Sequence, residues 1–258
     1  MLLTHEKKKK PAPDAPIGVD PLGLRSLGHE VVSYLSVPKT FQMPRREIGE
    51  NGRPRKGWCA FHFAWQALHY FVPGEWNEAV RPPSSAANDE LLGFRIPRRL
   101  DRLASLLRFP GLRIGVLPSY LLRRNLVLEI DGHACSGYAD LRGAMLRRGR
   151  FREPALAVDQ VILALEQDEP VGIDINLAPL GFRDHVLFVY ATSHTSLFVI
   201  DSMVVPGLGY TPVAGFTGKG HMMELPFEEF EKRWTSHGRI WTVRGLPPPR
   251  KGLRETKR

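Results

Sequence analysis

Two different patterns of hydrophobic and polar positions divide this chain near residue 170. Before that point, four segments carry apolar side chains at helical spacing and are expected to be helices: residues 59–71, 98–108, 138–148 and 155–167. Two short apolar runs, residues 111–117 and 126–130, are expected to be strands. The first half of the chain is therefore predicted to be mainly helical.

Beyond residue 170 the pattern is that of an antiparallel sheet. Four β-rich runs are expected to be strands: residues 170–175, 185–190, 197–201 and 240–243. The polar stretch 193–196 separates the second run from the third, which predicts a hairpin, and a helix is predicted over residues 226–234. Helices in the first half and antiparallel strands in the second indicate an α+β fold in two lobes.

Length and composition favour one folded domain between two basic ends. A chain of 258 residues suits a single domain, and 43% hydrophobic with 24% charged residues is typical of a globular protein. Residues 1–30 are rich in Lys, Pro and Gly and are expected to be a flexible arm, while residues 247–258 form a basic tail. The domain itself is predicted to span residues 31–246.

Cys59 is the first candidate for chemistry, because it opens the predicted helix 59–71 just after Gly57. The dipole and the free backbone N–H groups at a helix N-terminus favour a thiolate, which is the nucleophilic form of cysteine. Free cysteine is also among the most buried residue types, so simple packing is the alternative role for Cys59.

His185 and Asp201 are the candidate partners of Cys59. His185 opens one strand of the predicted hairpin and Asp201 closes the other, so the two side chains are expected to meet. A cysteine nucleophile needs a base, and the base needs a third group that orients its ring. The alternatives are an ordinary half-buried histidine and an aspartate that only begins a turn.

Two other reactive side chains are assigned no catalytic role. His62 lies one helical turn after Cys59 and is expected to pack, because a base on the same helix leaves no cleft for a substrate. Cys135 lies in a turn-like polar stretch close to His133 and is expected to be structural or incidental.

Several short segments follow one another in an order that matches a known family. They are the run 37–42 that ends in Gln42, Cys59-Ala60 with its apolar helix, the helix and strand over 156–173, the element from His185 to Asp201, and residues 225–230 with Trp234. Over residues 33–245 this order resembles the papain-like cysteine peptidase superfamily. Within that superfamily it is most similar to the bacteriocin-processing (double-glycine leader) peptidases.

The resemblance implies a papain-like two-lobed fold, in which the nucleophile helix of an N-terminal helical lobe packs on a C-terminal antiparallel sheet. It also implies that Cys59, His185 and Asp201 form a catalytic triad. Gln42 would supply the amide of the oxyanion hole, and Asn51 is a second candidate for that amide.

The sequence departs from the family pattern in three places. Ala60 stands where the family usually has glycine, and Gln42 lies seventeen positions before Cys59, farther than in the family. The interval of 126 positions from Cys59 to His185 is also long. It implies a helical insertion over about residues 83–150.

Charge and cysteine content limit the partners. The net charge of +9 lies in basic runs, which attract nucleic acids or anionic surfaces, but no nucleic-acid-binding motif accompanies them and a solvated surface is favoured. Two cysteines make neither a disulfide framework nor a metal motif, so no metal or other cofactor is expected. The chain has no signal peptide or membrane-spanning run, which predicts a cytoplasmic protein or an effector exported without a cleavable signal.

These features predict a cysteine peptidase that cleaves a protein or peptide substrate through an acyl-enzyme intermediate. Two alternatives stay open. The same triad serves deamidases, acyltransferases and effector toxins. A catalytically inactive papain-like protein could instead act as a basic adaptor that binds nucleic acid or a protein.

Overall fold

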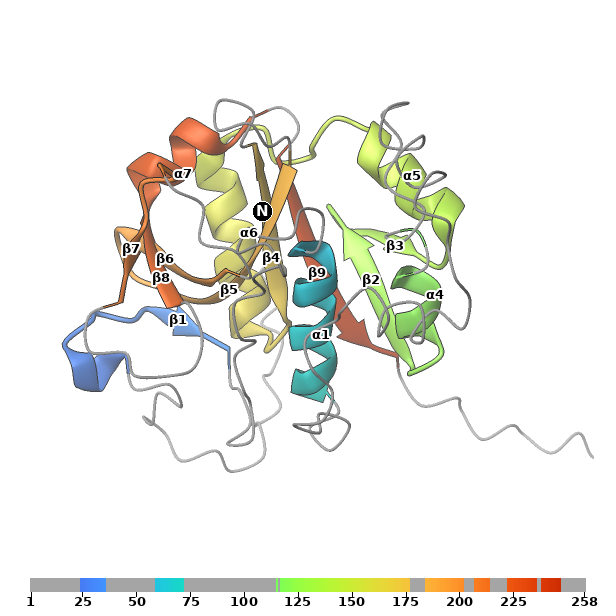
Figure 1. Ribbon diagram of the computed structural model, residues 1–258, viewed down its shortest axis with the longest axis horizontal. Coiled ribbons are helices and arrows are strands. Elements are labelled where there is room, and N and C mark those ends of the chain that lie inside the picture. The colour runs from blue at the N-terminus through green and yellow to red at the C-terminus, as the bar shows by residue number, and fades with distance from the viewer. Residues whose placement is uncertain are drawn as a thin grey trace, which may run out of the picture.

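The computed structural model describes residues 24–35, 59–71, 115, 117–176, 184–201, 207–213, 222–235 and 238–246. The predicted helix over residues 98–108, the tail 247–258 and the two candidate oxyanion-hole residues, Gln42 and Asn51, lie outside these ranges. The described residues form helices and one large antiparallel sheet, so the predicted α+β class is confirmed (Figure 1).

Nine strands make up the sheet. They are β1 (Ser33–Tyr34), β2 (Leu126–Ile130), β3 (His133–Cys135), β4 (Val171–Asn176), β5 (Asp184–Thr192), β6 (Ser196–Ile200), β7 (Thr211–Pro212), β8 (Met222–Pro226) and β9 (Arg239–Gly245). The order across the sheet is β3-β2-β9-β4-β5-β6-β8-β7, and β1 pairs with the far end of β5. Every pairing is antiparallel.

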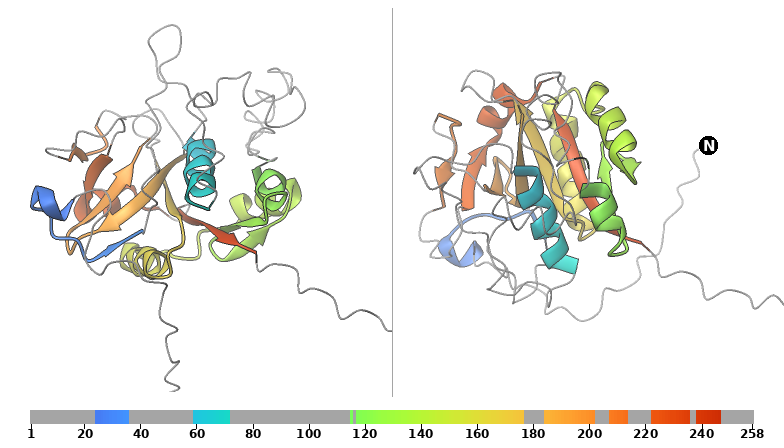
Figure 2. Two further views of the ribbon diagram at one scale, coloured as in Figure 1. Left: turned by 90° about the horizontal axis from the view of Figure 1, so that it is seen from below. Right: turned by 45° about the vertical axis from the view of Figure 1, so that its right-hand side comes forward.

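Helices cover both faces of this sheet. They are the short 3-10 helix η1 (Arg25–Leu27), α1 (Cys59–Phe71), α4 (Leu117–Leu122), α5 (Tyr138–Leu146), α6 (Pro154–Glu166) and α7 (Phe227–Arg233). Figure 2 shows α1 on one face of the sheet and α6 on the other. In contrast, α4 and α5 pack at the β2–β3 end of the sheet. The two layers on the central strands are the reason that β4, β5 and β6 are buried almost throughout.

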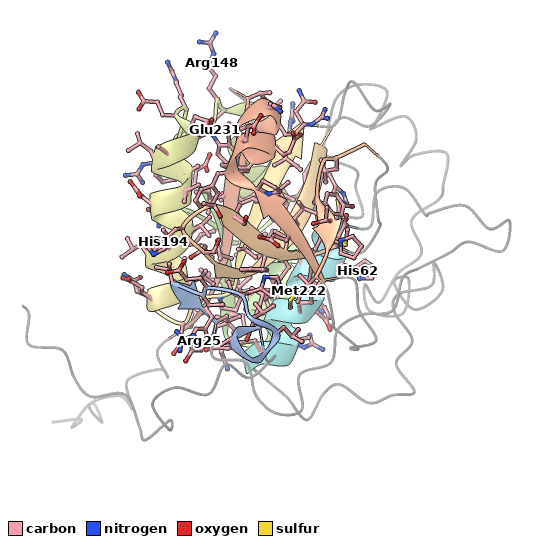
Figure 3. All side chains as sticks on the ribbon, turned by 90° about the vertical axis from the view of Figure 1, so that its left-hand side faces the viewer. Arg25, His62, Arg148, His194, Met222 and Glu231 are labelled. Carbon is pink, nitrogen blue, oxygen red and sulfur yellow. The ribbon has the colours of Figure 1, made fainter. Side chains whose placement is uncertain are left out.

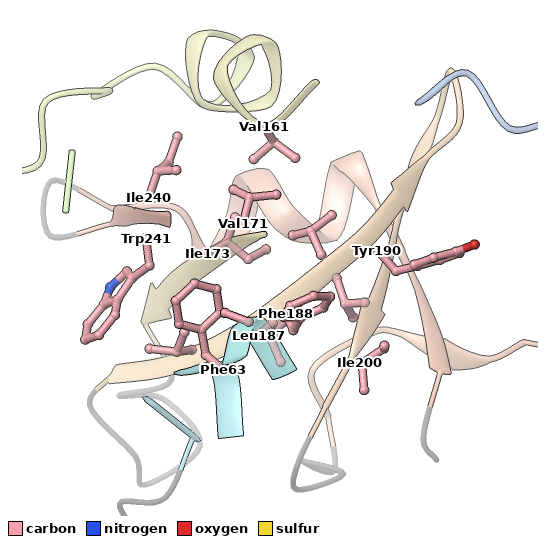
Figure 4. Packing of buried hydrophobic residues seen from close by; sticks show 14 of the residues in the cluster. Phe63, Val161, Val171, Ile173, Leu187, Phe188, Tyr190, Ile200, Ile240 and Trp241 are labelled. Atoms are coloured by element: carbon pink, nitrogen blue, oxygen red, sulfur yellow. The ribbon is translucent and has the colours of Figure 1, made fainter. Parts of the chain in front are cut away.

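Helix α1 packs on the sheet through the aromatic ring of Phe63. Phe188 of β5, Gly172 of β4 and Trp241 of β9 are neighbours in the strand register. The ring of Phe63 lies over this row, with its centroid 6.0 Å from that of Phe188 and 6.1 Å from that of Trp241 (Figure 4). A Cβ atom at position 172 would lie 2.7 Å from the Phe63 ring, so Gly172 provides the space that the ring fills.

Most of the described predicted elements are confirmed. The helices α1, α5, α6 and α7 and the strands β2, β4, β5, β6 and β9 lie where the pattern indicates, within a few residues at their ends. The predicted hairpin is confirmed as well, since β5 and β6 pair antiparallel around the turn at residues 193–195.

Other predictions are wrong or too simple. Leu117, the last residue of the predicted strand 111–117, begins helix α4, where Pro118 suits the first turn because its ring fixes φ and it has no N–H to pair. Cys135 lies in strand β3 and not in a turn. The flexible arm was predicted to reach residue 30, but Leu24 is fully buried in the core.

The predicted strand over residues 126–130 is present as β2, but it joins the same sheet as the strands of the second half. Strand β2 comes from the first half and pairs with β9 from Leu126↔Gly245 to Ile130↔Trp241. The described part of the predicted helical insertion therefore holds two strands of the main sheet besides α4 and α5. Strands β1 and β7 are two residues long, too short to produce any period in the sequence.

Gly172→Ala is expected to destabilise the protein by about 1–3 kcal/mol, because the new methyl group overpacks the contact between α1 and the sheet. Gly143→Ala in α5 is the matched control, since a Cβ there has no neighbour within 4 Å. This control is expected to gain about 0.5–1 kcal/mol from helix propensity. Urea unfolding of both variants measures the two effects, and a Gly172→Ala protein as stable as the wild type would contradict the described docking of Phe63.

Candidate active site

His185 and Asp201 meet at one end of the β5–β6 hairpin. His185 is the second residue of β5 and Asp201 follows β6 directly, and the antiparallel pairing Phe188↔Ile200 brings these ends together. The Nε2 atom of His185 lies 2.8 Å from the Oδ1 atom of Asp201. Their side chains are 2% and 0% exposed, so the pair is removed from solvent.

Cys59 is the first residue of α1 and is half-buried. Helix α1 packs against β5, which places the Cys59 side chain close enough to His185 to raise the pKa of the imidazole. Since Nε2 of His185 faces Asp201, Nδ1 is the ring nitrogen left for the thiol. The structure therefore brings all three candidate triad residues together, from three elements far apart in the sequence.

The electrostatics of this group favour a protonated histidine. Burial by itself lowers the pKa of His185, but the charge of Asp201 and its hydrogen bond to the ring act in the opposite direction. The hydrogen bond and the charge of Cys59 add to this effect, and the pKa of His185 rises well above its usual value. An imidazolium beside a cysteine at a helix N-terminus is the environment that supports a thiolate.

Tyr210 is a member of this group that the sequence did not reveal. Its hydroxyl donates a hydrogen bond of 2.6 Å to Oδ2 of Asp201. The residue lies between Gly209 and the two-residue strand β7, in a stretch without hydrophobic period. Only its position nine residues after Asp201 hinted at proximity, which is too weak a signal to single out one tyrosine.

His62 lies on α1 (Figure 3), and it belongs to the surroundings of the site because the charges of Asp201 and His185 both act on its ring. The side chain is 2% exposed, as expected for a packed residue, yet its Nδ1 atom has no hydrogen-bond partner among the described residues. Burial lowers the pKa of His62 to about 4; the charge of Asp201 raises this pKa and that of His185 lowers it. His62 is therefore neutral at pH 7 and adds no charge beside the nucleophile.

The second cysteine lies elsewhere. Cys135 is 1% exposed in β3, the strand at the opposite end of the sheet from β7. Burial, with the nearby Asp140 and Glu129, raises the pKa of the Cys135 thiol to about 11. This thiol is therefore expected to be unreactive at neutral pH.

The candidate oxyanion hole is described only in part. Gln42 and Asn51 lie outside the described residues, so their predicted role stays a prediction. The backbone N–H of Cys59 belongs to the first turn of α1, where N–H groups have no partner within the helix. It is one donor of the kind that stabilises an oxyanion.

Within the described ranges, no group of three or more His, Cys, Asp or Glu side chains is arranged to hold a metal ion. No described helix is long and apolar enough to cross a membrane.

Comparison with known proteins does not identify the site. No family model matches the sequence, and no curated protein matches it either. The role of Cys59, His185 and Asp201 therefore has to be derived from their chemistry and geometry.

His62 should make the folded state sensitive to acid. Its pKa is about 4 in the folded protein and about 6.5 when unfolded, so below pH 6.5 the unfolded state binds a proton that the folded state does not. Between pH 7 and pH 5 this difference is expected to cost about 2 kcal/mol of stability. The loss should be absent from His62→Leu, which lacks this titrating group.

Urea unfolding of the two proteins at pH 7, 6 and 5 measures this contribution. Parallel stability curves for wild type and His62→Leu would show that His62 is not buried as a neutral group.

Proposed function

We propose that this protein is a cysteine hydrolase of the papain-like kind, which cleaves amide bonds in proteins or peptides. The observation that carries the proposal is the buried hydrogen bond between His185 and Asp201, with Cys59 near enough to His185 to raise its pKa. A nucleophile, a base and a residue that orients the base are the parts that this chemistry requires.

The fold around these residues supports the same proposal. A helix that begins with the cysteine lies against an antiparallel sheet that carries the histidine and the aspartate, as the resemblance to papain-like peptidases implies. We extend the proposal to the two-lobed arrangement of that family, in which α1 belongs to one lobe and β5 and β6 to the other.

In the proposed mechanism the Cys59 thiolate attacks the carbonyl carbon of the scissile amide. The carbonyl oxygen becomes an oxyanion, which the backbone N–H of Cys59 and a side-chain amide, from Gln42 or Asn51, stabilise. The imidazolium of His185 then protonates the amine as the C–N bond breaks, leaving a thioester on Cys59. His185 finally takes a proton from water, which hydrolyses the thioester and restores the thiolate.

Asp201 acts through His185 in this scheme. Its carboxylate accepts from Nε2, which keeps Nδ1 turned toward Cys59 and stabilises the imidazolium. Asp201 does not need to accept the proton itself.

The thiol of Cys59 is expected to react with iodoacetamide at pH 7 at least about tenfold faster than a free cysteine, because His185 holds it as a thiolate. His185→Ala is expected to remove the enhancement. Cys135 provides an internal control, since its buried thiol should stay unlabelled in the folded protein. Mass spectrometry of tryptic peptides separates the two sites.

A Cys59 that reacts like a free thiol, equally in wild type and His185→Ala, would argue strongly against catalysis. That result would favour the inactive adaptor, for which salt-dependent binding of an oligonucleotide that survives Cys59→Ala is the expected property.

The reaction type is tested with a peptide library analysed by mass spectrometry. Cleaved peptides are expected from the wild type and not from Cys59→Ala, and Asp201→Asn is expected to lower the rate by roughly 10²-fold because the base loses its orientation. A mass increase of about one dalton at glutamine without cleavage would identify a deamidase instead. Neither product from a protein whose Cys59 is hyper-reactive would contradict the proposed cleavage of peptide amide bonds.

A further inference from the structure

We propose that Tyr210 is a positioning residue that holds the Asp201 carboxylate in line with the ring of His185. The catalytic consequence rests on the function proposed above, whereas the effect on His185 does not. Tyr210, Asp201 and His185 form one hydrogen-bonded series of three side chains, and Cys59 acts on His185 at its end.

The geometry at Asp201 carries this inference. One carboxylate oxygen, Oδ1, lies 2.8 Å from Nε2 of His185, and the other, Oδ2, accepts from the Tyr210 hydroxyl at 2.6 Å. Donors on both oxygens prevent the carboxylate from rotating about its terminal bond. Because Tyr210 holds Oδ2, the other oxygen, Oδ1, stays in line with the imidazole ring of His185.

Tyr210 is itself held firmly by neighbouring elements. Immediately after it, β7 pairs with β8 through Thr211↔Glu224. Three residues before it, the carbonyl of Gly207 accepts a hydrogen bond of 3.0 Å from Nη2 of Arg233, at the end of α7. Leu208 between these anchors is fully buried.

The backbone at Gly209, next to Tyr210, packs closely against Glu229 of α7. Its φ of +84° is in the left-handed region, and a Cβ there would lie 2.4 Å from a carboxylate oxygen of Glu229. The backbone next to Tyr210 therefore has one conformation that only glycine adopts without strain. The segment 207–213 places the tyrosine hydroxyl at a fixed distance from Asp201.

The hydrogen bond also has an electrostatic effect of definite sign. The Tyr210 hydroxyl compensates part of the negative charge on Asp201, which is the charge that raises the pKa of His185. The other titratable groups around His185 in the described residues are Cys59 and His62 on α1. Loss of the hydroxyl leaves more of the carboxylate charge to act on His185, so the pKa of His185 is expected to rise further.

The first test measures this pKa without requiring any enzymatic activity. The His185 ring protons are followed by NMR against pH in Cys59→Ala and in Cys59→Ala with Tyr210→Phe. An increase in proton affinity of about tenfold, one pKa unit, is expected from the loss of a hydrogen bond to a charged group. Tyr120→Phe on α4 is the matched control and should leave the titration unchanged, because α4 packs on β2.

The second test uses the protein with Cys59 intact. The rate of Cys59 alkylation is measured against pH, and its alkaline limb, where His185 loses its proton, should move upward in Tyr210→Phe by the same amount. With a cleavable peptide, kcat should fall while KM stays the same, because the proposed role of Tyr210 is to position Asp201 and not to bind substrate.

The outcomes distinguish the role of Tyr210 from the proposed function of the site. A shifted His185 titration with an ordinary Cys59 reactivity would uphold the role of Tyr210 and overturn the proposed function. A reactive, His185-dependent Cys59 whose profile is identical in Tyr210→Phe would overturn the role of Tyr210 alone. If Tyr210→Phe unfolds, Arg233→Met tests the same role, since loss of the anchor at Gly207 should shift the same titration in the same direction, and an unchanged titration would overturn it.

Discussion

The contact of Phe63 with Gly172 is the constraint on which the candidate site depends. Cys59 lies one helical turn before Phe63 on the same side of α1, so the depth at which the Phe63 ring sits determines how far the thiol lies from the sheet. Phe188 and Trp241 flank this ring on the neighbouring strands and fix its sideways position. The ring of Phe63 thereby fixes the position of α1 relative to β4, β5 and β9, in the space that Gly172 leaves because it has no side chain.

The sheet holds the charged pair of the site, His185 and Asp201, in a buried position. A buried imidazolium and carboxylate lose most of their hydration, and such a pair is tolerated only when its remaining polar atoms are also satisfied. Asp201 meets this condition with a donor on each oxygen, from His185 and Tyr210. The site is thus built from the inside outward, with the fully buried carboxylate at one end and the half-buried thiol at the surface end.

The neighbouring histidine shows why burial alone does not determine a protonation state. His62 and His185 are equally buried, but the pKa of the first is lowered and that of the second is raised. His185 has a direct hydrogen bond to the carboxylate, whereas for His62 the effect of the Asp201 charge is smaller than that of burial. Direct contact with the anion outweighs desolvation at His185, whereas the charge of the anion does not outweigh it at His62.

The sequence by itself determined the local structure and the identity of the three candidate residues. Helical spacing predicted α1, and the β-rich runs around the turn at residues 193–195 predicted the hairpin that joins His185 to Asp201, because each of these signals lies within a continuous segment. The tertiary structure decided what depends on contacts between distant segments. It paired β2 with β9, placed Phe63 over Gly172 and brought Tyr210 to Asp201. No local pattern encodes these contacts, since the free energy that fixes them comes from packing and from hydrogen bonds between residues that meet only in the folded chain.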